Sequence, residues 1–338
     1  MKPLVSILIP AYNAEAWIAD TLKSAIAQTW PRKEIIVVDD GSRDGTLEAA
    51  RKFESAEVKV ITQENQGAAA TRNKAWSLCQ GDYIQWLDAD DLLSPDKVAL
   101  QMGAAERCGS RRTALSSGWG NFRYRPHKAK FIPTALWADL TPLEWLTRKM
   151  EFTLHMQTAT WLTSRELTQA AGPWNTQLLG DDDGEYFARV LMAADAVKFV
   201  PGARVYYRIS PASRLSYIGS SQRKMEAQLA SMQTNIRYLR SLEDSPRVRA
   251  ACLEYLRVWQ PAFYSEQSEL VAKARQLAAE LGGDLPPPTF SWKYAWIQHL
   301  FGWSAASRTR MRYNECKCAV VRWWDKSLHV LETRRHIR

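Results

Sequence analysis

The sequence lacks the features of an integral membrane or secreted protein. It contains no uninterrupted apolar run of about 18 residues, the length a spanning helix needs. Its five cysteines are an odd number without framework or metal-site spacing, which argues against a disulfide scaffold and against zinc. The apolar stretch near the N-terminus is broken early by Pro10, unlike a secretory signal. We therefore expect a protein of a reducing, cytoplasmic compartment.

Two common nucleotide-binding signatures are also missing. No Gly-x-Gly-x-x-Gly follows the first apolar run, and no Gly-Lys-Ser/Thr phosphate loop occurs. Their absence argues against a nicotinamide-dependent enzyme and against a P-loop ATPase. The apolar content of 46% and charged content of 24% are those of a folded domain.

Short apolar runs alternate with helical patterns along the first hundred residues. We expect strands at 4–10, 34–39, 58–62 and 83–87. Helices are expected between them at 14–28, from 46 to about 53, and after 66–70, where the helix carries Arg72 and Asn73. Such alternation predicts an α/β fold with a mostly parallel sheet flanked by helices. In that architecture the carboxyl ends of the strands share one crevice, where ligands bind.

Carboxylates stand at two of these strand ends. Asp39 and Asp40 follow the second strand, and Asp88, Asp90 and Asp91 follow the fourth. Carboxylates this close repel one another unless a cation lies among them. Hard oxygen ligands beside a phosphate-bearing substrate suit Mg²⁺ or Mn²⁺. A solvated acidic loop, with Asp91 capping the next helix, remains the alternative at this point.

The motifs resemble those of family 2 glycosyltransferases, the inverting enzymes with the GT-A fold. The matching pieces occur in the family's order: IPAYN at 9–13, VDDGS at 38–42, DGT at 44–46, NQG at 65–67, RN at 72–73 and LDADD at 87–91. Each piece is weak alone, but together they make the resemblance strong. With the later motifs it covers about the first 210 residues, and it implies a nucleotide-sugar donor, most simply a UDP-sugar.

The resemblance also implies roles for individual residues. Asp39 would accept a hydrogen bond from the nucleobase, and Arg72 would lie near the base or the diphosphate. Asp88 and Asp90 would be the Asp-x-Asp pair that holds Mn²⁺ or Mg²⁺ on the diphosphate. The remaining residues expected around the donor are Pro10, Ala11, Tyr12, Asn13 and Ala89. A surface salt bridge is the structural alternative for Arg72, and a turn is the alternative for the Asp39 region.

A second acidic centre, GDDDGEYFAR, lies at 180–189. Aligned on Arg189, the family pattern makes Asp183 the catalytic base, which would take a proton from the attacking acceptor hydroxyl. Asp182, Glu185 and Asp91 are expected on the acceptor side. The structural alternative is a helix start, where acidic residues are favoured. Gly184 is a poor helix former, and we expect it to allow close approach of the acceptor.

The end of the matching region departs from the family. The segment YYRIS at 206–210 resembles a family ending of the form Tyr-Tyr-Arg-x-His, but Ser210 replaces the histidine. We expect a glycosyltransferase domain at 1–215, with a nucleotide-binding half at 1–112 and an acceptor half at 113–215. Residues 216–338 would form a helical C-terminal extension.

The extension carries most of the net positive charge. The whole chain has a net charge of +9, and residues 289–338 hold three lysines and seven arginines against three acidic residues, with five of the fifteen tryptophans. A helical cap with a solvated basic face is one interpretation. Peripheral contact with the inner face of the plasma membrane is another. Contact with nucleic acid is the least favoured.

The sequence therefore predicts a metal-dependent inverting glycosyltransferase that acts on a saccharide or lipid-linked saccharide. The alternative is a catalytically inactive nucleotide-sugar-binding or scaffold protein of the same fold. The donor sugar, the acceptor, the linkage and the oligomeric state have no readable code in the sequence.

Overall fold

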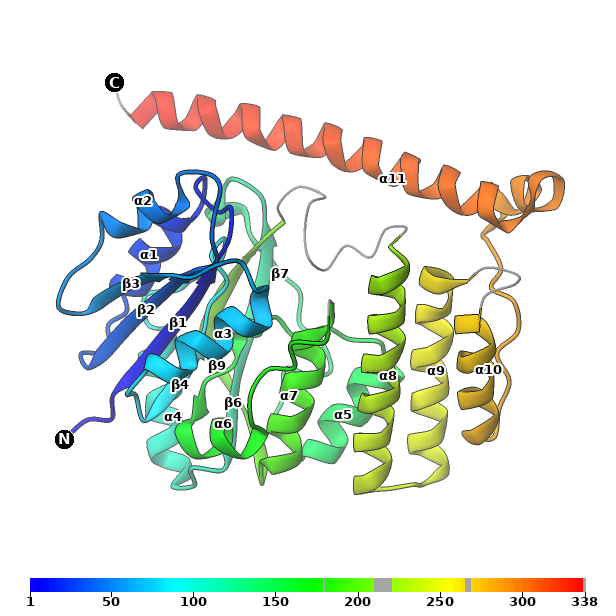
Figure 1. The fold of residues 1–338 in the computed structure, drawn as a ribbon, viewed down its shortest axis with the longest axis horizontal. Coiled ribbons are helices and arrows are strands. Elements are labelled where there is room, and N and C mark those ends of the chain that lie inside the picture. The colour runs from blue at the N-terminus through cyan, green and yellow to red at the C-terminus, as the bar shows by residue number, and fades with distance from the viewer. Residues whose placement is uncertain (179, 210–220, 265–268, 337–338) are drawn as a thin grey trace.

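The protein is described by a computed structural model covering residues 1–178, 180–209, 221–264 and 269–336. Its first sheet has the order β3-β2-β1-β4-β8. The strands in that order are β3 (Val58–Thr62), β2 (Lys33–Asp39), β1 (Val5–Ala11), β4 (Tyr83–Trp86) and β8 (Thr163–Ser164). The first four are parallel, and only β8 runs antiparallel to its neighbour β4. The expected α/β architecture is confirmed (Figure 1).

Helices connect and cover the parallel strands. They are α1 (Ile18–Ile26), α2 (Thr46–Arg51), α3 (Ala68–Leu78), α4 (Lys97–Cys108), α6 (Arg165–Ala171) and α7 (Asp182–Ala193). The central strands β1 and β2 are apolar along almost their whole length because both faces of the sheet are covered. This packing leaves the polar residues after each strand at one edge of the sheet.

A second, four-stranded sheet has the order β5-β9-β6-β7. Its strands are β5 (Leu92–Leu93), β9 (Ala196–Arg208), β6 (Thr113–Phe122) and β7 (Lys130–Phe131). The sequence patterns around 118–120 and 201–203 predict breaks, but β6 and β9 each run through as one strand. A register shift at Ser117/Gly118 absorbs the irregularity as a bulge.

The sequence TATWLT at 158–163 favours a strand, but most of this segment adopts a different structure. Residues Thr158–Thr160 form a 3-10 turn, and only Thr163–Ser164 pair as β8. The Gln157 side chain accepts a hydrogen bond from the Ala159 backbone N–H and so caps this turn. The turn brings Thr158 to the edge of the sheet where the polar residues gather.

The C-terminal helices pack against the α/β region through a shared core. They are α8 (Gln222–Leu242), α9 (Pro246–Phe263) and α10 (Glu269–Glu280), with α5 (Pro142–Glu151) beside α8 and α9. One hydrophobic cluster reaches from Leu8 in β1 to Leu285 after α10. The division at residue 215 remains a prediction, since 210–220 lie outside the described residues.

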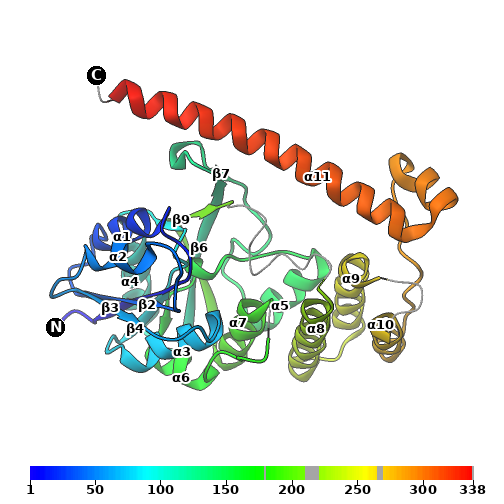
Figure 2. The same cartoon turned by 45° about the horizontal axis from the view of Figure 1, so that its top comes forward.

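The last helix, α11 (Trp292–His336), lies along one side of the molecule in both views (Figures 1 and 2). Its helical geometry is interrupted at Gly302, which has φ 78°. Its acidic residues anchor it, because Arg125 pairs with Asp325 at 2.8 Å and with Glu332 at 2.8 Å. Within the described chain, no helix has both the length and the apolar character needed to cross a bilayer.

Candidate active site

A cleft of about 780 Å³ lies at the carboxyl ends of β1 and β4. This volume is typical of small-molecule sites. Its lining includes most of the residues expected from the sequence: Pro10, Ala11, Tyr12, Asn13, Arg72, Asp88, Ala89, Asp90, Asp182 and Asp183. Residues nearly a hundred positions apart in the sequence therefore border one cavity.

The ends of β1 and β2 are tied together beside the cleft. The backbone N–H of Asn13 donates to Ser42 Oγ at 3.0 Å, and the Arg43 N–H donates to Asn13 Oδ1 at 2.9 Å. Asn13 adopts φ 48°, a left-handed conformation that asparagine tolerates better than most residues. These contacts fix the loop that carries Tyr12, whose side chain remains exposed.

The two aspartates after β2 differ in how far their oxygens are satisfied. Asp40 accepts hydrogen bonds from the backbone N–H groups of Gln66 and Gly67, which makes it a loop organiser. Asp39 is 1% exposed and does not line the cleft itself. Its Oδ2 accepts from Thr62 Oγ1 at 3.0 Å, whereas its Oδ1 is buried without a partner in the described chain. Buried polar atoms in proteins nearly always have a hydrogen-bond partner, so this oxygen is a candidate acceptor for a ligand donor.

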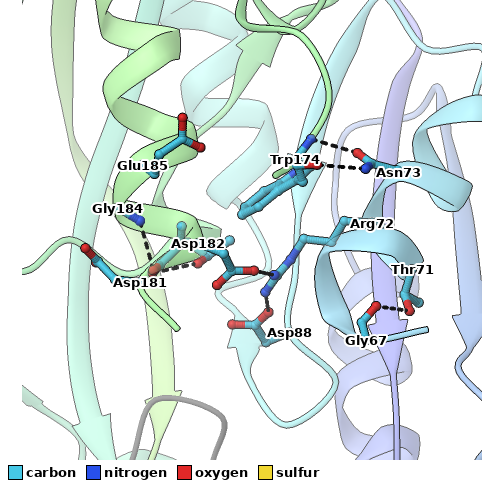
Figure 3. A network of polar contacts seen from close by, with 12 residues as sticks. Gly67, Thr71, Arg72, Asn73, Asp88, Trp174, Asp181, Asp182, Gly184 and Glu185 are labelled. Carbon is cyan, nitrogen blue, oxygen red and sulfur yellow. Dashed lines mark hydrogen bonds and ion pairs between the residues drawn. The ribbon is translucent and has the colours of Figure 1, made fainter. Parts of the chain in front are cut away.

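Arg72 on α3 joins the two acidic centres (Figure 3). Its guanidinium pairs with Asp182 at 2.7 Å and with Asp88 at 3.0 Å, and it lies 4.4 Å from the ring centre of Trp174. Arg72 is only 7% exposed, so the alternative interpretation of Arg72 as part of a surface salt bridge is wrong. Burial opposes its charge, but the neighbouring carboxylates outweigh burial and raise the pKa of Arg72.

The start of α7 presents Asp183 to the cleft. Asp183 Oδ1 accepts from the Gly184 N–H at 2.9 Å, and Oδ2 accepts from Thr158 Oγ1 at 3.4 Å. A Cβ on Gly184 would lie 2.2 Å from Asp181 Oδ1. A side chain at position 184 would therefore meet the Asp181 carboxylate, while the role expected for Gly184 toward the acceptor remains a prediction.

Two residues expected on the acceptor side do not line the cleft. Asp91 is fully buried and accepts from Gln157 Nε2 at 2.5 Å and from the Arg208 N–H at 2.7 Å. Glu185 is 4% exposed and pairs with Arg189 at 2.7 Å. Glu185 lies one turn after Asp182 on α7, and its ion pair with Arg189 holds its carboxylate away from the cleft lining. Both side chains hold the fold together, which corrects their expected role.

The structure adds cleft residues to which no role at the site was assigned from the sequence. They are Ala14, Ala16, Trp17, Asp40, Asn65, Gly67, Ala68, Thr71, His155, Gln157, Thr158, Gly180, Asp181, Tyr207, Lys224, Gln228 and Trp259. Lys224 and Gln228 come from α8 and Trp259 from α9, so the C-terminal helices form part of the wall. Ser210 lies outside the described residues.

Asp88 and Asp90 have the chemistry to hold a divalent cation together with a diphosphate. Among the described residues, no group of three or more His, Cys, Asp or Glu side chains converges into a self-sufficient metal site. Mg²⁺ commonly uses one or two protein carboxylates and completes its shell with substrate phosphate and water. The Asp88 side chain is 29% exposed at the cleft, and only its Oδ1 is engaged by Arg72. The pair therefore fits a metal that arrives with its phosphate ligand.

Asp181 makes the stability of the fold depend on pH. Burial raises the pKa of Asp181 from 3.8 to about 6. As pH rises from about 4 to 6, the unfolded chain loses this proton before the folded chain does, so stability falls, and the loss is complete above pH 6. Asp181→Asn should remove this dependence and be more stable than the wild type by roughly 1 kcal/mol above pH 6, since asparagine tolerates the left-handed backbone there. Urea denaturation between pH 4 and 7.5 measures it, and parallel curves for the two proteins would exclude it.

The sequence comparisons match the same region. Residues 6–160 match the family model described as glycosyl transferase family 2. Residues 6–160, which are 155 of the 338, are thus similar to glycosyl transferase family 2.

Two curated relatives that this chain resembles are named for glycan synthesis. The putative teichuronic acid biosynthesis glycosyltransferase TuaG of Bacillus subtilis is 43% identical over 104 residues, which are 30% of this chain and 41% of TuaG. Chondroitin synthase of Escherichia coli is 44% identical over 100 residues, which are 29% of this chain and 15% of that protein. The alignments thus span less than half of either relative.

Solved structures show that this chain has the GT-A fold. Residues 1–349 of S. aureus TarS in complex with UDP-GlcNAc align with a TM-score of 0.59 at 17% identity, covering 92% of each chain. The mannosyltransferase PcManGT of Pyrobaculum calidifontis, in complex with GDP-Man and Mn²⁺, aligns with a TM-score of 0.54 at 19% identity, covering 96% of this chain and 88% of that one. Both alignments reach into the C-terminal helical region.

Proposed function

We propose that the chain is a metal-dependent inverting glycosyltransferase that moves a sugar from a UDP-sugar to an acceptor hydroxyl in glycan synthesis. The observation that carries the proposal is the position of Asp183 on the same cleft as Asp88 and Asp90. An inverting transfer needs a cation-binding side for the leaving diphosphate and a base on the opposite side of the sugar. One cleft bordered by both groups meets that need.

On the donor side, the nucleotide would bind at the carboxyl ends of β1 and β2. The partnerless Asp39 Oδ1 would accept the N–H of a uracil ring, with Tyr12 and Ala11 beside it. Asp88 and Asp90 would hold Mn²⁺ or Mg²⁺ on the diphosphate. The cation would supply positive charge for the leaving group. Arg72, placed between Asp88 and Asp182, orients Asp88 and adds positive charge.

On the acceptor side, Asp183 would take the hydroxyl proton as the acceptor oxygen attacks the anomeric carbon. Its position is set by the Gly184 N–H and the Thr158 hydroxyl, which both contact the carboxylate. Attack from the side opposite the diphosphate inverts the anomeric configuration. In this proposal Asp182 is a positioning residue, since its carboxylate is held by Arg72.

Release of the nucleoside diphosphate tests this function against the inactive-scaffold alternative. The full chain is incubated with a panel of nucleotide sugars and a mixed set of saccharide acceptors, with Mn²⁺ or with a chelator. The proposal expects nucleotide release from a UDP-sugar that the chelator abolishes. Binding of UDP-sugars without any turnover would support the scaffold alternative.

We further propose that 289–338 contact an anionic membrane surface, which would bring the cleft to a lipid-linked acceptor. Residues 285–314 contain no acidic residue, and Asp325 and Glu332 farther along α11 pair with Arg125. Large apolar side chains on α11 are exposed: Trp292, Trp296, Leu300, Phe301, Tyr313, Val320, Val321, Trp323, Trp324, Val330 and Leu331. Exposed aromatics beside lysine and arginine are typical of helices that lie in the membrane interface. The cytoplasmic location also remains a prediction.

Flotation with vesicles tests the membrane contact. The full chain should float with vesicles that contain an anionic phospholipid and not with zwitterionic vesicles, and added salt should weaken the association. The Trp323→Ser/Trp324→Ser variant should lose most of the flotation because it removes two exposed apolar anchors. Equal recovery of both proteins with both kinds of vesicle would contradict the contact.

A further inference from the structure

A second, smaller cavity opens beside the cleft on its acceptor side. Its volume is about 80 Å³, and it lies among α5, α7, α9 and the loop that follows α5. It shares His155, Asp181, Asp183 and Trp259 with the lining of the large cleft. A group that enters it would therefore belong to a molecule whose remainder lies in the cleft near Asp183.

Two polar groups on the cavity residues lack hydrogen-bond partners in the described chain. They are the indole N–H of Trp145, a residue only 3% exposed, and the hydroxyl of Thr153. Buried donors are nearly always satisfied, and each unsatisfied one needs an explanation. An indole N–H and a hydroxyl can each donate to a carbonyl oxygen, and both residues belong to the lining of this cavity.

Thr153 is also conformationally unusual. It has φ 46°, a left-handed conformation that is a rare exception for a β-branched residue. Such strained residues cluster at binding and catalytic sites, where the surrounding structure maintains them. The strained residue here carries one of the two partnerless donors, which links the backbone observation to the cavity.

The size and chemistry of the cavity limit what it can hold. A protein cavity of about 150 Å³ holds benzene, so 80 Å³ suits roughly three or four non-hydrogen atoms and not a whole sugar ring. Met156, Trp161 and Phe187 offer apolar contact to a methyl group. Asp181 and Asp183 disfavour a carboxylate or phosphate and can accept from an amide N–H.

We propose that this cavity is a subsite for the acetamido group of an N-acetylhexosamine. The carbonyl oxygen accepts from Trp145 Nε1 and Thr153 Oγ1, and the methyl group packs on the apolar wall. This subsite rests on the proposed function, because it positions a sugar next to Asp183. The shared borders with the cleft allow the hexosamine to be the acceptor or the donor sugar.

Paired ligands that differ only in the acetamido group test the subsite. In the acceptor arm, methyl N-acetyl-β-glucosaminide and methyl β-glucoside are each titrated into the full chain with UDP and Mg²⁺. Saturation-transfer NMR measures the affinity of each glycoside. In the donor arm, nucleotide release compares UDP-GlcNAc with UDP-glucose. Burying one methyl group and forming one hydrogen bond predict about a twentyfold preference for the acetamido ligand in one arm.

Thr153→Val is the matched variant, since it removes the hydroxyl and keeps the shape. Because that hydroxyl has no partner in the chain, the variant should remain folded, and it should reduce the preference about fivefold. Thr147→Val, whose residue lies on α5 outside the cavity lining, is the control and should leave the preference unchanged.

The possible results distinguish failure of the proposed subsite from failure of the proposed function. A preference in either arm that Thr153→Val weakens supports the subsite and identifies its source. Turnover or glycoside binding without a preference in either arm overturns the subsite and leaves the proposed function standing. Absence of nucleotide release from every donor overturns the proposed function, while the binding arm still decides the subsite.

Discussion

Replacing Asp183 by asparagine should lower kcat for sugar transfer about a thousandfold. Asparagine keeps the shape and can still accept from the Gly184 N–H and the Thr158 hydroxyl, which now contact Asp183 at 2.9 Å and 3.4 Å. It cannot take a proton from an acceptor hydroxyl, and a positioned base contributes roughly 10²- to 10⁴-fold to rate. Initial rates of nucleotide release with a saturating acceptor measure the effect.

The same variant should bind the donor almost as well as the wild type does. Asp183 is assigned to the acceptor side, so calorimetric titration with a UDP-sugar and Mg²⁺ should give a Kd within a few fold. Asp195→Asn is the matched control, because Asp195 makes only an exposed pair with Arg112. A kcat for Asp183→Asn within threefold of the control would place the base elsewhere.

Replacing Arg72 by methionine should destabilise the fold by about 3 kcal/mol. The change leaves Asp182, which is 7% exposed, and the partly buried Asp88 without their shared cation. Breaking a buried pair by removing one partner costs about 3 to 5 kcal/mol, and the 29% exposure of Asp88 places this case at the low end. Urea denaturation at pH 7 measures the free energy of unfolding.

Arg112→Met provides the matched control for Arg72. Arg112 pairs with Asp195 at the surface, where both side chains are about half exposed, and such pairs contribute less than about 1 kcal/mol. Adding Asp182→Asn to Arg72→Met should recover part of the loss because it removes one unpaired charge. Equal stability for Arg72→Met and Arg112→Met would show that the bridge does not hold the two acidic centres together.

The parts of the site carried by short local motifs were predictable from the sequence. A strand followed at once by carboxylates fixes where those carboxylates lie, because strand ends in a parallel sheet share one edge. Asp88 and Asp90 thus reach the cleft as expected. Asp183, which was assigned from the family resemblance, reaches it from the start of α7. The ion pairs of Arg72 with Asp88 and Asp182 were not expected, since nothing local states which acids will face an arginine on another helix.

The expected cleft positions were wrong where tertiary packing decides which of two neighbouring acidic residues faces the cleft. Glu185 and Asp182 both lie in the first turn of α7, yet Arg189 holds Glu185 away from the cleft while Arg72 holds Asp182 at it. Asp91 follows Asp90 directly, but its carboxylate accepts hydrogen bonds from the Gln157 side chain and from the Arg208 backbone N–H. The spacing of these acidic residues in the sequence does not predict which of their side chains will reach the cleft.

The wall supplied by α8 and α9 could not be read from the sequence at all. Lys224, Gln228 and Trp259 belong to no motif, and they reach the cleft because the C-terminal helices share the core of the α/β region. The extension therefore contributes directly to the site that the sequence assigned to the first 215 residues. We expect substrate choice to depend in part on these residues, which only the packed structure brings to the cleft.

The central claim is that one cleft holds a metal-bound diphosphate on one side of a sugar and Asp183 on the other. The most direct test is to follow the anomeric proton by NMR while the full chain transfers the sugar of an α-linked UDP-sugar in the presence of Mg²⁺. The account predicts a product with the β configuration that forms only while the cation is available. A product that retains the α configuration, or one that forms equally well with a chelator, would contradict it.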